Sequence, residues 1–497
     1  MKKSITLLFV LIQSVLLGQT VSFNGSLINT SKTNSSKAKY SKIIETTKEL
    51  DIYEIDALAI FNHSNKKNSK GKTSFQLKLG NSHLWKLELT EHNLFSENFR
   101  RVTQTNKGKE ISYVVPKLKT YRGYNTNNDQ KVVITLGPNW IYGMITLENN
   151  EQYFIEPLQI YDSNVNPNQF VVYRPKKSID NNYSCGQNEI SIIDSDEKRA
   201  ISKSLSNVVC AEVAIAYDEL TKNKYGGNRQ AENILTSRFN SVSAFFLDNF
   251  EIDKKIIEFY EAGRNEIIHE NIVIPCNNIT FPDCGNNSIL ERFKNWGENN
   301  GFTSNPDVAT FFTAKDDVIN FIGYSYIGGI CLNTSYNWVD DTAGQFDFNK
   351  VNLWIHEYGH TWNGTHTDGF ASSSEMMNSM ISFSNPMTVN NFTYGRIIAH
   401  KNSRPCLNDG SCPGKKVLNI NDYLLTEIEV FPNPTNGILN INSKQQLKKI
   451  QVYNHLGQKI LETNQTQINT NNLTSGIYLL KIYSFNGEVG VKKFIKE

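Results

Sequence analysis

The densest group of potential metal ligands lies between Val351 and His366. The chain has 497 residues and 9 histidines, and this short stretch holds His356, His360 and His366. Imidazole nitrogens are preferred zinc ligands, and three of them leave a coordination position for water. Glu357 directly follows the first histidine, where its carboxylate could take a proton from zinc-bound water. The residue types and their spacing therefore indicate zinc-dependent hydrolysis.

A helix would position two of these ligands. Residues one helical turn apart project from the same face, so His356 and His360 can reach one ion if the segment is helical. Asn363 and Gly364 tolerate the left-handed conformation that ends helices, and they predict a sharp turn that returns His366 to the same ion. Apolar residues at helical spacing predict the face that packs on the core, namely Val351, Trp354, Ile355 and Tyr358.

The stretch resembles the signature HExxHxxGxxH of the metzincin zinc peptidases, in His356, Glu357, His360 and His366. One position departs from that signature. Asn363 stands where the family usually has glycine, and Gly364 follows it. Asparagine is the next best residue in the left-handed region, so we interpret the change as tolerated. A surface helix rich in histidine is the alternative interpretation.

The metzincin resemblance also implies a methionine in a tight turn beneath the zinc site, as an apolar floor for the histidines. Residues 375–379 read Glu-Met-Met-Asn-Ser and lie where that turn is expected. Met377 is the predicted turn methionine, with Met376 and Met380 as alternatives. Core filling by these methionines is the simpler interpretation.

The first residues of the chain have the form of a secretory signal peptide over residues 1–18. Lys2 and Lys3 precede an apolar run that ends at Gly18. No other run approaches the length of a membrane span. With 39% hydrophobic residues, 20% charged residues and a net charge of +2, the rest is ordinary globular material, and nucleic acid is not an expected partner.

Seven cysteines in an exported chain predict disulfides and at least one thiol without an intramolecular partner. Short loops could close two local pairs, and a longer link could lock the zinc segment between its ends. The sequence does not choose among these pairings, which are Cys276 with Cys284, Cys406 with Cys412, and Cys331 with Cys406.

Cys185 is a candidate inhibitory switch. A thiolate is a strong zinc ligand and could occupy the water position, which would hold an enzyme inactive. Reprolysin and matrixin proenzymes carry a Cys-Gly in such a place, and Cys185-Gly186 resembles it. The alternative is a disulfide with Cys210 or another cysteine.

The length suggests three domains, of which the first, residues 19–200, is expected to be β-rich. The segments 120–124 and 153–158 resemble the prodomain of reprolysin-type zinc peptidases, and that resemblance implies a precursor. Runs rich in β-forming residues predict strands at Phe75–Leu79, Trp85–Leu89, Lys131–Leu136 and Trp140–Leu147.

Residues 201–412 are expected to form an α/β or α+β catalytic domain. The run Gly323–Leu332 resembles the region before the zinc helix of reprolysin-like enzymes, where an edge strand pairs with extended substrate. An ordinary tight turn is the alternative at Gly328 and Gly329. The expected elements are strands at Val208–Tyr217, Ile256–Tyr260 and Ile267–Ile274, and helices at Asn228–Phe250 and Ser288–Trp296.

A linker is expected at residues 413–426 and an all-β sandwich at residues 427–497. The phrases Val430–Gly437, Val452–Lys459 and Leu473–Tyr478 resemble the C-terminal sorting domain of type IX secretion cargo. This resemblance implies export across the outer membrane by the type IX machinery. A carbohydrate-binding or adhesive module is the alternative.

Together these features predict a multidomain, secreted zinc endopeptidase of the reprolysin-like metzincin branch, made as a precursor. His356, His360 and His366 are the predicted metal ligands of one catalytic zinc ion, and Glu357 the base that assists attack by zinc-bound water. Calcium is a possible second ion without support, since no acidic loop of the EF-hand type is present. The expected partners are protein or peptide substrates, and the expected location is extracellular or on the cell surface, reached through the periplasm. A catalytically silent zinc-containing adhesion or binding protein is the alternative function.

Overall fold

The computed structural model forms two compact units, Met1–Pro413 and Gly414–Glu497. It describes residues 21–28, 47–68, 71–147, 151–176, 185, 208–268, 289–315, 322–343, 346–372, 374–379, 387–408, 428–443, 447–454, 458–484 and 489–497. The predicted signal peptide and the predicted linker lie outside these residues, and so do Met380, Cys276, Cys284 and Cys412.

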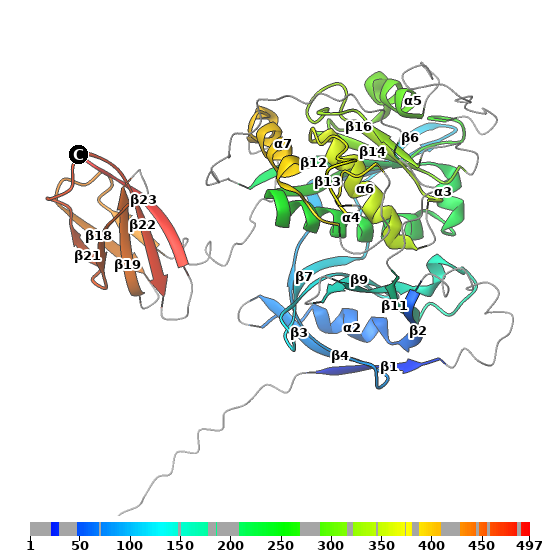
Figure 1. The fold of residues 1–497 in the computed structure, drawn as a ribbon, viewed down its shortest axis with the longest axis horizontal. Helices are drawn as coiled ribbons and strands as arrows, with labels where there is room; N and C mark the ends of the chain where they lie inside the picture. Colours follow the sequence, from blue (N-terminus) through cyan, green and yellow to red (C-terminus); the bar gives the residue numbers. More distant parts are fainter. Residues whose placement is uncertain are drawn as a thin grey trace, which may run out of the picture. The chain divides into compact units, whose positions relative to one another are not determined.

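A closed β-barrel makes up most of the N-terminal region (Figure 1). Side chains alternate between the core and the surface, as in β3, where Phe75, Leu77 and Leu79 are buried. Helix α2 (Ala57–Ser64) packs Ala57 and Ile60 into the same core. In order around the barrel, the strands are β1 (Ser22–Leu27), β2 (Thr47–Ile55), β11 (Gln169–Pro175), β10 (Gln152–Pro157), β9 (Trp140–Thr146), β8 (Gln130–Gly137), β7 (Lys119–Asn125), β4 (His83–Glu91) and β3 (Lys72–Leu79).

A 7-stranded sheet forms the second layer of this unit. Its inner strands pair in parallel and are buried on both faces, as expected for strands covered by helices. In order across the sheet, the strands are β15 (Gly323–Ser325), β16 (Tyr336–Asp340), β14 (Val308–Thr313), β12 (Val209–Tyr217), β13 (Ile252–Glu261), β5 (Phe95–Thr105) and β6 (Gly108–Ser112). The last two strands come from the predicted prodomain; in Figure 1, β6 lies in cyan beside the later strands.

Helices cover both faces of this sheet. Alternate residues of β12, such as Val213 and Ile215, pack with α4 and α6 on one face, while Ala214 and Ala216 face α5 on the other. The helices are α3 (Glu219–Lys224), α4 (Asn228–Phe250), α5 (Ile289–Trp296), α6 (Asp347–Thr361) and α7 (Asn391–Asn402), with shorter turns η2 (Leu158–Ile160), η4 (Gly297–Gly301) and η5 (Pro405–Asn408).

The second unit contains two antiparallel sheets with one shared core. Its buried residues come from both sheets, for example Leu439 and Leu480. One sheet joins β17 (Ile428–Phe431), β18 (Ile438–Ser443) and β21 (Gln467–Asn469); the other joins β20 (Lys459–Thr463), β19 (Leu447–Asn454), β22 (Gly476–Ser484) and β23 (Val489–Lys496).

The chain is thus multidomain and rich in strands, as predicted. The helix predicted at Asn228–Phe250 is confirmed with the same bounds. The strand predicted from Ile267 is wrong in its first two residues, because Ile267 and Ile268 form bends, and residues 269–274 lie outside the described part. β-Branched residues gave the wrong signal there, since they also suit a buried loop that packs on the core.

Candidate metal centre and active site

Helix α6 carries His356, Glu357 and His360, and all three side chains are buried. The two histidines lie on one face, one turn apart, as predicted from their spacing. The apolar face of the helix, with Leu353 and Trp354, packs on the core shared with β12 and α4. The ligand-type residues therefore stand on a rigid element rather than on a loop.

The chain turns sharply after α6. Asn363 has a φ of 73°, the left-handed conformation that the sequence predicts at this position. The N–H of Gly364 donates to the carbonyl of Gly359 at 2.8 Å, which closes the helix end. Arg396 of α7 donates to the Asn363 carbonyl at 2.8 Å. This turn brings His366 back over the helix.

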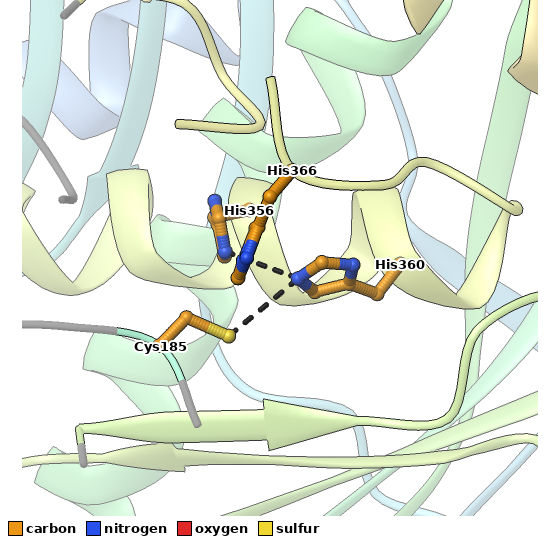
Figure 2. Close-up of side chains that lie close together, drawn as sticks. All are labelled: Cys185, His356, His360 and His366. Carbon is orange, nitrogen blue, oxygen red and sulfur yellow. Dashed lines mark hydrogen bonds between the residues drawn. The ribbon is translucent and has the colours of Figure 1, made fainter. Parts of the chain in front are cut away.

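Four potential ligands converge at this point, as Figure 2 shows. The ligand atoms of Cys185, His356, His360 and His366 all lie within 4.8 Å of one another. His360 Nε2 lies 3.1 Å from His356 Nε2 and 3.5 Å from the Cys185 sulfur. The three predicted histidines and the candidate switch cysteine are therefore brought together.

The hydrogen bonds of the histidines fit a metal ion. His356 Nδ1 lies 2.7 Å from the Met376 carbonyl, and His360 Nδ1 lies 2.9 Å from the Gly364 carbonyl. A carbonyl only accepts, so each Nδ1 carries the hydrogen and each Nε2 presents a lone pair. The Nε2 atom of His366 is buried without a hydrogen-bond partner in the described part of the chain. Converging lone pairs repel unless a cation binds them, and imidazole nitrogen and thiolate sulfur are both ligands that zinc binds.

The protonation of these histidines also suits metal binding. Burial lowers the pKa of His356 to about 3 and that of His366 to about 4. Burial and the two neighbouring histidines hold the pKa of His360 well below its usual range. Neutral imidazoles are the form that binds metal, so the site does not need to lose protons near pH 7.

Glu357 lies on the same turn of α6 and contacts β15. The Ser325 hydroxyl donates to Glu357 Oε2 at 2.6 Å. A Cβ at Gly323 would lie 2.5 Å from Glu357 Oε1, so only glycine leaves room for the carboxyl group there. Burial raises the pKa of Glu357 to about 8, against the opposing effects of Ser325 and Cys185. Such a carboxyl group is suited to exchange a proton near neutral pH.

Met376 and Met377 form a fully buried floor below the histidines. A Cβ added at Gly359 would lie 2.3 Å from the Met377 sulfur, and one at Gly364 would lie 3.0 Å from it. Met377 therefore sits against both ends of the turn that carries His360. The backbone of Met376 serves the site as well, because its carbonyl holds His356.

Cys185 is buried and is not part of a disulfide, so the alternative pairing with Cys210 is wrong. Its backbone N–H donates to the Ser379 carbonyl at 3.1 Å, beside the methionine turn. Of the pairings left open by the sequence, Cys331 with Cys406 is formed. That disulfide links the chain before α6 to the chain after α7.

Two supporting residues were missed in the sequence. Ser325 holds Glu357, and Glu375 accepts from the Met377 N–H and from the Thr367 hydroxyl, each at 2.7 Å. Glu375 stands two residues before the predicted turn methionine, Met377, so its position was a usable signal. Ser325 offered none, since a lone serine in a glycine-rich run is unremarkable.

Comparison with protein families agrees with this arrangement. Residues 206–404 match the family described as Metallo-peptidase family M12. Residues 429–497 match the family described as Secretion system C-terminal sorting domain. No curated protein sequence matches the chain. In the described residues, no helix is both long enough and apolar enough to cross a membrane.

The predicted resemblances to a reprolysin-type peptidase and to a type IX sorting domain are thereby confirmed for the regions that match, and the resemblance of the first region to a prodomain stays a prediction. The M12 family implies a zinc cofactor and protein substrates, and the sorting domain implies export through type IX secretion machinery to the cell surface or beyond. Residues 206–404 are therefore a reprolysin-type M12 metallopeptidase domain and residues 429–497 a type IX secretion sorting domain, and together they support a secreted metallopeptidase.

Proposed function

We propose that this protein is a zinc endopeptidase of the reprolysin-like metzincin branch, with His356, His360 and His366 as the ligands of one zinc ion. The convergence of three neutral imidazoles, two of them fixed with Nε2 as the lone-pair atom, carries the proposal. A bound zinc ion supplies a Lewis acid that polarises the scissile carbonyl and acidifies water. A silent binding protein would not need a buried carboxyl group beside the ligands.

Glu357 is proposed to move the proton. Its carboxylate takes the proton from the attacking water and passes it to the amine that leaves. Ser325 fixes one carboxyl oxygen at 2.6 Å, which leaves the other oxygen for proton transfer. Because Ser325 and Glu357 are both buried, the carboxyl group of Glu357 exchanges its proton with the substrate rather than with bulk water.

The substrate is proposed to bind along β15. This short strand is the last one on its side of the sheet in the described part of the chain, and its other side pairs with β16. An extended peptide can add to such an edge through main-chain hydrogen bonds. Because Ser325 of β15 contacts Glu357, a peptide on this edge would pass beside the base.

Cys185 is proposed to keep the precursor inactive, with residues 19–200 as the prodomain. Its sulfur lies 3.5 Å from His360 Nε2 within the ligand group, where the thiolate would complete a closed four-ligand site. Its backbone bond to Ser379 holds the residue in the position that substrate would need.

Glu357→Gln tests the proton-transfer role. The variant, activated by cleavage after the predicted prodomain, is expected to lose activity about 10³-fold on a peptide substrate, since that is a typical contribution of general base catalysis. Zinc content should stay at the wild-type level, because the amide keeps the shape of the side chain. Glu219→Gln, on the surface helix α3, is the matched control and should change neither quantity. Wild-type turnover by the Glu357 variant would disprove the role.

Cys185→Ala tests the inhibitory switch. The uncut variant is expected to cleave peptides while the uncut wild type does not. In cobalt-substituted protein, the wild type should also show a thiolate-to-cobalt charge-transfer band that the variant lacks. An uncut wild type that is as active as the variant, or the absence of that band from the wild type, would contradict the proposal.

A further inference from the structure

Strands β5 and β6 form a hairpin that is part of the peptidase sheet, although both precede the predicted end of the prodomain. β5 pairs in parallel with β13, with Glu258 opposite Arg100 and Tyr260 opposite Val102. β6 then pairs with the outer side of β5. The hairpin therefore covers the edge of β13 with main-chain hydrogen bonds, as an added strand does in strand-addition complexes.

Apolar side chains near this hairpin are buried among residues of the M12 region. Phe99 packs on Phe259 with ring centroids 5.8 Å apart, and both belong to the main core of the peptidase region. Val102 is fully buried on the other face of the sheet, in the cluster that contains Phe293 of α5. Departure of the hairpin would expose both cores at one edge, which is the behaviour of an obligate interface.

Two buried carboxylates of the M12 region also bond to residues in or just before the hairpin. Arg101 donates two hydrogen bonds to Glu232 of α4, one of them at 2.6 Å, and Glu232 is fully buried. Asp253, also fully buried, lies 3.1 Å from His92. A buried carboxylate that loses its hydrogen-bonded partner is strongly destabilised.

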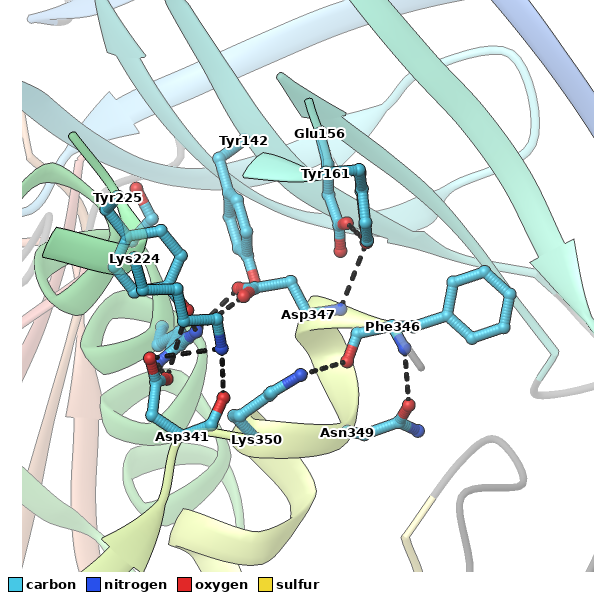
Figure 3. A network of polar contacts seen from close by, with 12 residues as sticks. Tyr142, Glu156, Tyr161, Lys224, Tyr225, Asp341, Phe346, Asp347, Asn349 and Lys350 are labelled. Carbon is cyan, nitrogen blue, oxygen red and sulfur yellow. Dashed lines mark hydrogen bonds and ion pairs between the residues drawn. The ribbon is translucent and has the colours of Figure 1, made fainter. Parts of the chain in front are cut away.

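A second contact supports the first turn of α6, as Figure 3 shows. The Asp347 N–H donates to the Tyr161 hydroxyl at 3.0 Å, and the Tyr142 hydroxyl donates to the Asp347 carboxylate at 3.0 Å. Phe346 stacks on Tyr173 of the barrel at 4.5 Å, and Phe348 stacks on Phe154 at 4.4 Å. The helix that carries the ligands thus begins inside a contact with the barrel.

These contacts differ in kind from that of Cys185, which reaches the ligand group with its thiol and is held there by its backbone bond to Ser379. The hairpin shares a sheet and two cores with the M12 region, and the N-terminal region adds hydrogen bonds to buried carboxylates of that region. A cut between Cys185 and the M12 region removes none of the residues that make these contacts. We propose that the N-terminal barrel and its β5–β6 hairpin stay bound after maturation, so that the active enzyme is a non-covalent complex of two chains.

The proposal rests on the proposed function only in assuming that the chain is cut during maturation, and association can be measured without any activity. The full chain would carry a specific protease site inserted within residues 186–207. After cutting, gel filtration and analytical ultracentrifugation at submicromolar concentration should show both fragments in one particle. Separation of the barrel fragment, whether the rest stays folded or precipitates, would overturn the proposal.

Matched arginine variants test the hairpin contact. Arg101→Gln removes the ion pair with Glu232 and should raise the dissociation constant of the cut complex at least about 10-fold. Arg174→Gln is the control, since Arg174 has nearly the same exposure, 23% against 26%, but pairs with Glu49 and Glu151 inside the barrel region. Equal dissociation constants for the two variants would exclude the hairpin as the site of retention.

The activity outcomes are separate. If the cut complex carrying Cys185→Ala persists but no peptide is cleaved, the proposed function fails and the retention stands. If the fragments separate and the M12 fragment alone cleaves peptides, the retention fails and the function stands.

Discussion

The two ends of helix α6 are held in different ways. The ligand end, from His356 to Thr361, is fixed by nearby chain, through the carbonyls of Met376 and Gly364 and the sulfur of Met377. The barrel end, from Phe346 to Lys350, is fixed by tyrosines that come about two hundred residues earlier. The metal-ligand end of the helix is therefore held by residues close to it in the sequence, whereas the first turn is held by residues far from it in the sequence.

The two ends of α6 are therefore expected to respond differently to substitutions. The ligand end has short-range contacts that reform whenever α6 and its following turn are in place. The barrel end depends on a buried polar network in which Arg238 pairs with Asp341 and Asp347. Changes at the barrel end should therefore reduce stability first, and changes at the ligand end should reduce turnover first.

Arg238→Met should give the largest loss of stability. The guanidinium group lies 2.6 Å from Asp341 and 2.5 Å from Asp347, and all three side chains are almost completely buried. Removing it leaves two buried carboxylates without this partner, at a cost of about 4 kcal/mol in the free energy of unfolding. Urea denaturation of the full chain measures the loss.

Lys131→Met is the control for that variant. Lys131 of β8 pairs with Asp248, which lies on α4 as Arg238 does, but both side chains are about half exposed. Exposed pairs contribute less than about 1 kcal/mol. If both variants lost the same small amount of unfolding free energy, the buried network around Arg238 would not be what stabilises the barrel end of α6.

Acid should weaken the ligand end of the zinc-free protein. Burial lowers the pKa of His366 from 6.5 to about 4, so between these values the unfolded chain binds more protons than the folded chain. Stability contributed by this group is present above pH 6.5 and is lost as the pH falls toward 4, by about 3 kcal/mol. Urea midpoints after chelation, measured from pH 7 to pH 4, test this.

The barrel end should respond to acid in the opposite direction. Burial and the charge of Asp347 raise the pKa of Glu156 to about 8. A raised carboxyl pKa favours the folded state more as the pH falls, so Glu156 cannot cause acid loss. Glu156→Gln should therefore steepen the acid loss of the zinc-free protein. An unchanged or shallower slope would show that the two ends do not titrate with opposite signs.

Sequence reasoning succeeded where contacts are local. The helix, the left-handed Asn363 and the convergence of three histidines follow from spacing and residue type, because each depends on a few neighbouring residues. The partners of Asp347 could not be read in the same way. Tyr142 and Tyr161 carry no motif, and only the fold brings them to α6. The addition of β5 to β13 was missed for the same reason, since strand order is not encoded in periodicity.

Ser325→Ala tests the ligand end without touching a ligand. Loss of the hydroxyl releases Glu357 Oε2, and kcat of the trimmed enzyme should fall about 10-fold with little change in KM, as expected for one hydrogen bond to a charged group. Ser325→Thr keeps the hydroxyl and should recover much of kcat. Ser335→Ala, another buried serine, is the control. A rise in KM alone would assign Ser325 to substrate binding instead of to positioning the base.

Asn363 offers the smallest and most local test, because its backbone has a φ of 73° and its carbonyl accepts from Arg396. Asn363→Ala places a residue with a poor left-handed preference in that turn and should cost about 1 kcal/mol in unfolding free energy. Asn363→Gly adopts the conformation without strain, so it should lose less than the alanine variant although it also lacks the side chain that contacts Arg396. Thermal denaturation of the zinc-loaded proteins separates these contributions. If the glycine variant were as destabilised as the alanine variant, the contact with Arg396 and not the backbone conformation would hold the turn. The ligand end of α6 would then depend on a distant element, α7, just as the other end depends on the barrel.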